Sequence, residues 1–95
     1  MSDEPVRRLV AISNEQGLHA RPADMIARLA TQFKSRITVI KDTQRVDAKS
    51  ILNLLTLGAE AGTQLEIEAV GADAQQAVDA LAELIESGFP EKGPA

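Results

Sequence analysis

The spacing of hydrophobic residues changes repeatedly along this chain of 95 residues. Alternating apolar and polar residues are typical of a half-buried strand, and apolar residues three or four apart are typical of an amphipathic helix. The spacing predicts strands at 6–12, 37–39, 45–47 and 64–70, and helices that begin near Ala20, cover 51–57 and cover about 74–87. The predicted order of elements is β-α-β-β-α-β-α, an α+β fold.

Residues 64–70 show the cleanest alternation in the chain. This pattern places Leu65, Ile67 and Ala69 on one face of a strand and Gln64, Glu66 and Glu68 on the other. Because parallel sheets are covered on both faces, a strand with one wet face favours an antiparallel sheet with helices on one side. We therefore expect the polar face of this strand, with Gln64, Glu66 and Glu68, to contact water.

Residues 17–23, GLHARPA, contain the only histidine of the chain. Pro22 is tolerated only in the first turn of a helix, so the helix should begin near Ala20. The free amides of Ala20 and Arg21, together with the helix dipole, would then form a phosphate site beside His19. His19 is the candidate nucleophile, and the Arg21 guanidinium is a further phosphate donor. The alternative is that His19 is merely a cap or a satisfied polar residue.

The short helix predicted over 51–57 has apolar side chains almost all around its axis. A helix of about two turns that lies on a sheet cannot bury them all, so some should form an exposed docking site. The alternative is full burial, against the first helix. Ser50 is the candidate N-cap of this helix, and Gly58 is the left-handed residue that ends it. Gly88 and Pro90 are expected to stop the last helix.

Composition limits the possible functions. A hydrophobic content of 44% suits one small domain, while the absence of cysteine and the single histidine argue against disulfides and a metal site. A net charge of −4 without Trp or Tyr argues against nucleic-acid binding. No apolar run approaches the roughly 20 residues that cross a bilayer, which predicts a cytoplasmic protein without membrane insertion. Residues 1–49 hold nine of the ten basic side chains and six of the fourteen acidic ones, which favours an acidic partner.

Residues 17–23, with AKSIL at 48–52 and TLG at 56–58, resemble the motifs of HPr. HPr is the histidine-containing phosphocarrier family of the bacterial phosphoenolpyruvate-dependent phosphotransferase system. The resemblance covers about residues 5–89. It implies an open-faced β-sandwich, in which a four-stranded antiparallel sheet carries three helices on one face. The chain would be a single domain over 1–95 with a flexible tail at 90–95.

The resemblance also implies a phosphoryl relay rather than a stand-alone enzyme. His19 would accept the phosphoryl group from phosphorylated Enzyme I on Nδ1 and pass it to IIA-type acceptors, with no cofactor and as a monomer. HPr kinase/phosphorylase would phosphorylate Ser50 and so weaken docking. The partner-docking residues implied by the family are Ala20, Asp24, Arg28, Ile51, Leu52, Leu55 and Thr56.

Some positions depart from the family pattern. Gln16 stands where Asn or Ser often precedes the glycine, and Asp24 adds a negative charge one turn after Arg21. The ending ESGF at 86–89 resembles the nitrogen-related branch, NPr. Two alternatives remain beside the carrier. One is a regulatory module that binds enzymes or transcription factors, and the other is a sandwich in which His19 and Arg21 hold a free anionic ligand.

Overall fold

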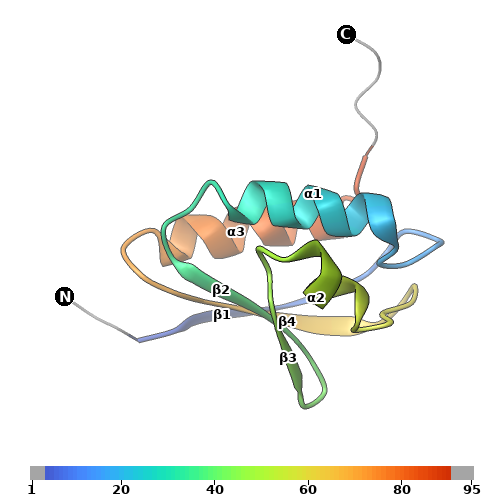
Figure 1. Ribbon diagram of the computed structural model, residues 1–95, viewed down its shortest axis with the longest axis horizontal. Coiled ribbons are helices and arrows are strands. Elements are labelled where there is room, and N and C mark those ends of the chain that lie inside the picture. Colours follow the sequence, from blue (N-terminus) through green and yellow to red (C-terminus); the bar gives the residue numbers. More distant parts are fainter. Residues whose placement is uncertain (1–3, 91–95) are drawn as a thin grey trace, which may run out of the picture.

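The computed structural model describes residues 4–90, and Figure 1 shows the predicted order of strands and helices. Of the tail predicted at 90–95, residues 91–95 lie outside the described residues, and so do residues 1–3. The elements are β1 (Val6–Ala11), α1 (Ala20–Ala30), β2 (Arg36–Lys41), β3 (Gln44–Asp47), α2 (Ile51–Leu55), β4 (Gln64–Val70) and α3 (Ala74–Glu86).

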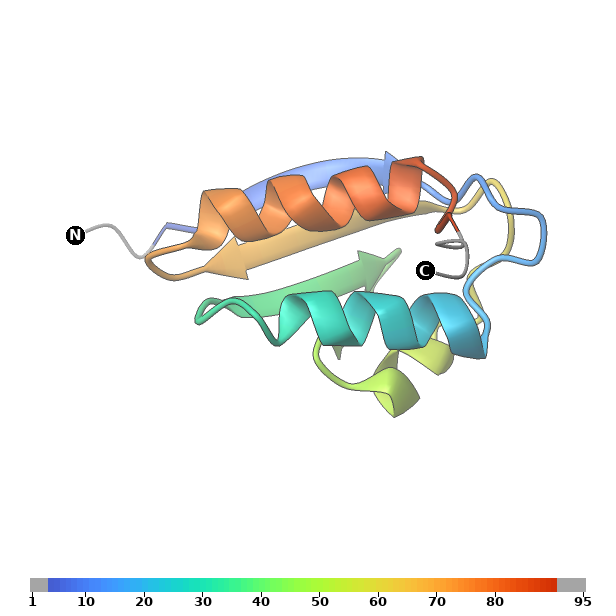
Figure 2. The ribbon, with the colours of Figure 1, turned by 90° about the horizontal axis from the view of Figure 1, so that it is seen from above.

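The four strands form one antiparallel sheet in the order β1-β4-β2-β3. Helices α1 and α3 lie over one face of this sheet, and α2 lies beside α1 near β3 (Figures 1 and 2). Because α1 and α3 run in opposite directions, the N-terminal end of α1 and the C-terminal end of α3 lie at the same end of the molecule (Figure 2). This is the open-faced sandwich expected from the sequence.

The hydrophobic core lies between the sheet and the helices. Ile37, Val39 and Ile67 face it from the sheet, while Ile26 and Leu81 face it from the helices, and each is at most 1% exposed. These positions follow the strand alternation and the helical spacing of the sequence. The core therefore fixes α1 and α3 against the sheet.

Glu68 corrects the prediction that the polar face of residues 64–70 is wet. The residue is only 7% exposed, although it lies on the sheet face away from the core. Its carboxylate accepts a hydrogen bond from Arg7 Nε at 2.7 Å, and it also pairs with Arg45 from β3. The Arg7 hydrogen bond is the main cause that lowers the pKa of Glu68, with Arg45 acting in the same direction and burial opposing both. Two arginine side chains thus bury a residue that alternation alone assigns to solvent.

Element ends differ slightly from the predicted ones. The first strand ends at Ala11, because the amide of Ile12 bonds to the carbonyl of Thr63 outside the strand ladder. The second helix ends at Leu55 rather than 57, and Thr56 is its C-cap. Gly58 has φ +56° and Gly88 has φ +81°, so both predicted helix-ending glycines adopt the left-handed conformation.

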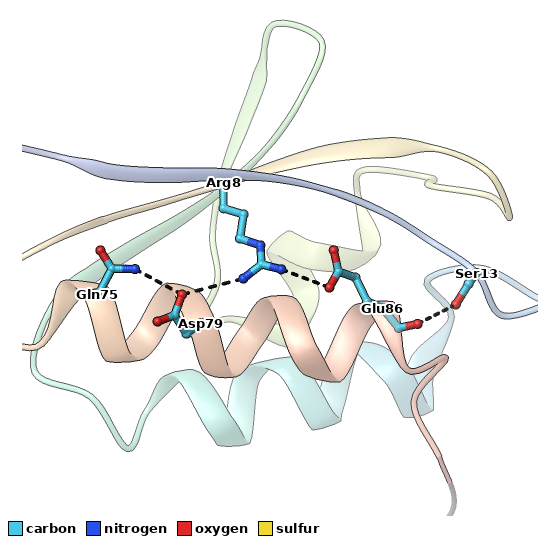
Figure 3. A network of polar contacts seen from close by, with 5 residues as sticks. All are labelled: Arg8, Ser13, Gln75, Asp79 and Glu86. Carbon is cyan, nitrogen blue, oxygen red and sulfur yellow. Dashed lines mark hydrogen bonds and ion pairs between the residues drawn. The ribbon is translucent and has the colours of Figure 1, made fainter.

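Polar contacts also join β1 and the loop after it to α3 (Figure 3). Arg8 reaches Asp79 at 3.6 Å and Glu86 at 3.2 Å, and the hydroxyl of Ser13 donates a hydrogen bond to the carbonyl of Glu86 at 3.3 Å. The ion pairs are largely exposed and stabilise the fold little. They nevertheless place the C-terminal end of α3 next to the loop that leads to His19.

Candidate functional site

His19 is the N-cap of α1, directly before the predicted helix start at Ala20. Its backbone is extended, with φ −96° and ψ −166°, and its side chain makes no capping hydrogen bond. The residue is half-buried. Within residues 4–90 no hydrogen bond engages the imidazole ring, so both ring nitrogens are available to a reactant.

The first turn of α1 supplies unpaired donors beside this ring. The amide of Ala23 bonds to the carbonyl of His19 at 3.0 Å, and Pro22 has no amide hydrogen. Among the described residues no carbonyl accepts from the amides of Ala20 or Arg21. These two N–H groups and the positive end of the helix dipole form a site suited to an anion.

The loop before His19 is held against residues 59 and 60. The amide of Leu18 donates to the carbonyl of Ala59 at 2.8 Å, and the Asn14 side-chain amide donates to the carbonyl of Gly17 at 2.8 Å. Gly17 has φ +68°, and a Cβ there would stand 2.5 Å from the Ala59 oxygen. Only glycine fits this turn, which fixes the direction from which the chain enters the helix.

Arg21 is exposed, as its predicted role requires, but its guanidinium already has partners. Nη2 donates to the carbonyl of Phe89 at 3.2 Å, and Nη1 lies 3.1 Å from the sulfur of Met25. Phe89 is 1% exposed and has φ +57°. Sequence reasoning missed this contact. The only signal was Gly88, which predicted a turn after α3 but not which side chain the turn would meet.

The second helix presents the predicted exposed cluster. Ile51 is 37% exposed, Leu52 is 77% exposed and Leu55 is 37% exposed, whereas Leu54 is fully buried and Leu57 nearly so. Full burial, the alternative for this helix, is therefore wrong for these three residues. Leu52 lies two residues before the buried Leu54, on the opposite side of the helix, and it is the most exposed of the three.

Ser50 caps α2 as predicted, since its hydroxyl oxygen accepts a hydrogen bond from the amide of Asn53 at 3.2 Å. The residue is half-buried at the edge of the exposed cluster. Thr56, at the other end of α2, is exposed, and its hydroxyl donates to the carbonyl of Asn53 at 2.6 Å.

The remaining predicted docking residues lie on α1. Ala20 is exposed, and the Arg28 guanidinium pairs with the Asp24 carboxylate at 2.8 Å, one turn apart on the helix surface. Asp24 is thus neutralised by Arg28 rather than by Arg21. Since α1 and α2 lie side by side, the structure brings the predicted docking residues of both helices onto neighbouring elements (Figures 1 and 2).

Comparisons with known proteins agree with this geometry. A family model described as "PTS HPr component phosphorylation site" matches residues 6–87. The phosphocarrier protein HPr of Neisseria meningitidis serogroup A is 42% identical over 86 residues, covering 90% of this chain and 97% of the relative. The phosphocarrier protein NPr of Proteus mirabilis is 42% identical over 86 residues, covering 88% and 94%.

The crystal structure of HPr from Thermoanaerobacter tengcongensis superposes with a TM-score of 0.87 at 41% identity, covering 92% of this chain and 98% of that one. The open-faced sandwich, the histidine at the start of its first helix and these matches together are those of the phosphocarrier class of the phosphotransferase system. The chain belongs to the HPr family, which includes HPr and NPr. No helix within residues 4–90 has the length and apolar character that crossing a membrane requires.

Proposed function

We propose that His19 carries a phosphoryl group from phosphorylated Enzyme I to a IIA-type acceptor. The observation that carries this proposal is the position of His19, an N-cap whose ring has no hydrogen bond with any residue of 4–90. A ring nitrogen of His19, Nδ1 by family resemblance, attacks the phosphorus in line. A nitrogen–phosphorus bond forms on His19 as the one in Enzyme I breaks, and the electron pair of that bond returns to the Enzyme I histidine.

Phosphoryl transfer has little covalent chemistry for the protein to perform, so positioning and charge stabilisation dominate catalysis. The free amides of Ala20 and Arg21 are donors for the phosphoryl oxygens. The Arg21 guanidinium has donors beyond the two that engage Phe89 and Met25, and these remain available to the same oxygens. The second transfer, to the acceptor, reverses the first with the same groups.

Partner docking on α1 and α2 is the second part of the proposal. The exposed Ile51, Leu52 and Leu55 would contact both Enzyme I and the acceptor, together with Ala20, Asp24, Arg28 and Thr56. We propose that the chain acts as a single-domain cytoplasmic monomer, because two different partners must reach one ring in turn.

Ser50 is the proposed regulatory site, with HPr kinase/phosphorylase as its modifying enzyme. Its hydroxyl caps α2, so a phosphate there would meet the helix N-terminus and stand beside Ile51. The added negative charge would oppose an acidic partner at the docking surface. The modification would thereby switch the relay off without unfolding the helix.

The experiment that tests the relay is incubation with phosphoenolpyruvate and Enzyme I, followed by intact-mass measurement. Wild type should gain one acid-labile phosphoryl group, His19→Ala should gain none, and Ser50→Ala, the control for hydroxyl phosphorylation, should gain as wild type does. No gain in wild type, or a gain in His19→Ala, would contradict the proposal. Mixing the phosphorylated carrier with sugar-branch and nitrogen-branch IIA proteins then identifies the protein that accepts the phosphoryl group.

A further inference from the structure

An open cleft of about 550 Å³ lies between the start of β2 and the end of β3. Four of its nine lining residues are cationic, namely Lys34, Arg36, Arg45 and Lys49, and only Asp47 is anionic. The whole chain has ten basic residues and a net charge of −4. Four of the ten basic residues thus converge on one concavity of an acidic protein, which the proposed phosphoryl relay does not use.

The positive charge of this cleft is incompletely neutralised. Arg45 pairs with Glu68, but Arg7 also pairs with that single carboxylate, and the Arg45 side chain remains 54% exposed. Lys34 and Arg36 are exposed, and their side chains form no ion pair with another residue of 4–90. An anion bound here would therefore meet donors that no protein acceptor occupies.

Hydrogen bonds to the backbone hold the charged groups in and beside the cleft. The Lys49 ammonium is held at 2.8 Å by the carbonyl of Phe33, which fixes its position while leaving donors free. The Asp47 carboxylate accepts the amide of Lys49 at 2.9 Å, and Asp73, which is outside the lining, accepts the amides of Lys34 and Ser35. The carboxylates of Asp47 and Asp73 therefore both accept hydrogen bonds from backbone amides.

The volume of the cleft, about 550 Å³, is that of a small-molecule site. Small-molecule sites are concave and of roughly 300–1,000 Å³, whereas docking faces for acidic proteins are flatter and wider. Arg and Lys together provide both the planar fork and the point charge that recognise phosphate oxygens. We propose that this cleft binds a small anion that carries phosphate groups.

The site is separate from the phosphoryl relay. The lining of the cleft begins at Lys34, after α1 ends at Ala30, whereas His19 directly precedes the start of α1. A helix of 11 residues is about 16 Å long, so a small anion in the cleft does not touch the imidazole. A variant that loses anion binding in the cleft can therefore still be assayed for phosphoryl transfer at His19, and the reverse also holds.

The test is an amide-resolved NMR titration of the full chain with inorganic pyrophosphate at constant ionic strength. The amides of 34–38 and 45–49 should shift saturably, and Lys34→Gln/Arg36→Gln should weaken this binding at least tenfold. Arg8→Gln, which removes one positive charge on β1 outside the cleft, as Lys34→Gln alone does within it, should bind as wild type does. Lys34→Gln alone is the second variant, and thermal unfolding monitors the fold of each.

Each outcome decides the proposal. Absence of saturation at these amides, or equal shifts with sodium chloride, would overturn it, as would unchanged affinity in the double variant. Stronger binding of a hexaglutamate peptide than of pyrophosphate would assign the cleft to an acidic protein instead. The same titration on His19→Ala should retain the cleft shifts, so a failed phosphotransfer assay and a failed cleft assay remain distinguishable.

Discussion

The guanidinium of Arg21 donates a hydrogen bond to the main-chain carbonyl of Phe89, with 3.2 Å between nitrogen and oxygen. This contact ties the first turn of α1 to the turn that follows α3. The Phe89 ring is buried in the core, so the carbonyl is held by packing. Arg21 is therefore anchored by a part of the chain distant in sequence.

Replacing Phe89 with Ala should loosen this anchor and the core together. A buried Phe→Ala change costs about 3–5 kcal/mol of unfolding free energy. In protein that remains folded, the rate of His19 phosphorylation should fall severalfold, because Arg21 loses its fixed position. Phe89→Leu, which keeps an apolar side chain, is the milder control. In an Arg21→Ala background the Phe89→Ala change should no longer slow the reaction, and a full additional slowing there would contradict the link.

Gly17→Ala should destabilise the loop that carries His19. A non-glycine residue in the left-handed region costs about 1–2 kcal/mol, and the clash with the Ala59 carbonyl adds about 1–3 kcal/mol of overpacking. Gly62→Ala is the matched control, since Gly62 has φ +87° with nothing within 4 Å of the added Cβ. Denaturant unfolding should show the larger loss for Gly17→Ala, and only that variant should phosphorylate more slowly. Equal losses of unfolding free energy in the two variants would mean that the close approach of Gly17 to Ala59 does not affect stability.

Substitutions of Ser50 should separate its cap from its charge. Asp, Asn and Ser cap helices about equally well, whereas Ala costs about 1 kcal/mol. Ser50→Asp and Ser50→Asn should both keep the wild-type melting temperature, but only Ser50→Asp should slow transfer from Enzyme I. Added salt should narrow that difference, because it screens exposed charges. Equal rates for the two variants would argue against charge as the regulatory signal.

Leu52 and Leu54 form a matched pair on α2, since the first is 77% exposed and the second fully buried. Leu54→Ala should cost about 2–5 kcal/mol of unfolding free energy. Leu52→Ala should change stability by no more than about 0.5 kcal/mol and instead raise the KM for Enzyme I. An unchanged KM in Leu52→Ala would remove Leu52 from the docking surface.

Glu68 should make the stability of the fold sensitive to acid. Its pKa is lowered from the ordinary value of 4.5, chiefly by the Arg7 hydrogen bond, so the unfolded chain binds the proton more readily. The stabilisation is complete above about pH 4.5 and is lost as pH falls through the lower native pKa. Glu68→Gln should cost about 1–3 kcal/mol at neutral pH and less in acid. Glu83→Gln, an exposed control, should follow wild type, and a pH-independent loss in Glu68→Gln would disprove this origin.

The sequence predicted features that depend on neighbouring residues. The start of α1 at Ala20 follows from Pro22 and the end of α3 follows from Gly88, while α2 ends two residues before the end predicted from Gly58. The exposed residues of α2 follow from an apolar surface too wide for one short helix to bury. Each of these features is decided within a turn or two of chain, where local sterics and hydrogen bonding dominate.

Contacts between distant segments were not predictable in the same way. Alternation assigned Glu68 to the face away from the core, but its burial depends on Arg7 and Arg45, which reach it from β1 and β3. The Arg21–Phe89 hydrogen bond likewise joins residues 68 positions apart. A periodic pattern specifies which face a residue occupies, not which long side chain from another element covers it.

The position of β1 at the edge of the sheet has a consequence for biosynthesis. Among residues 4–90 its one strand partner is β4, so the backbone ladder of Val6 cannot form until Ala69 is available. Such distant pairings make chain closure slow compared with local helix formation. On the ribosome, β1 therefore emerges long before β4 and is exposed to chaperones and proteases until β4 has left the exit tunnel.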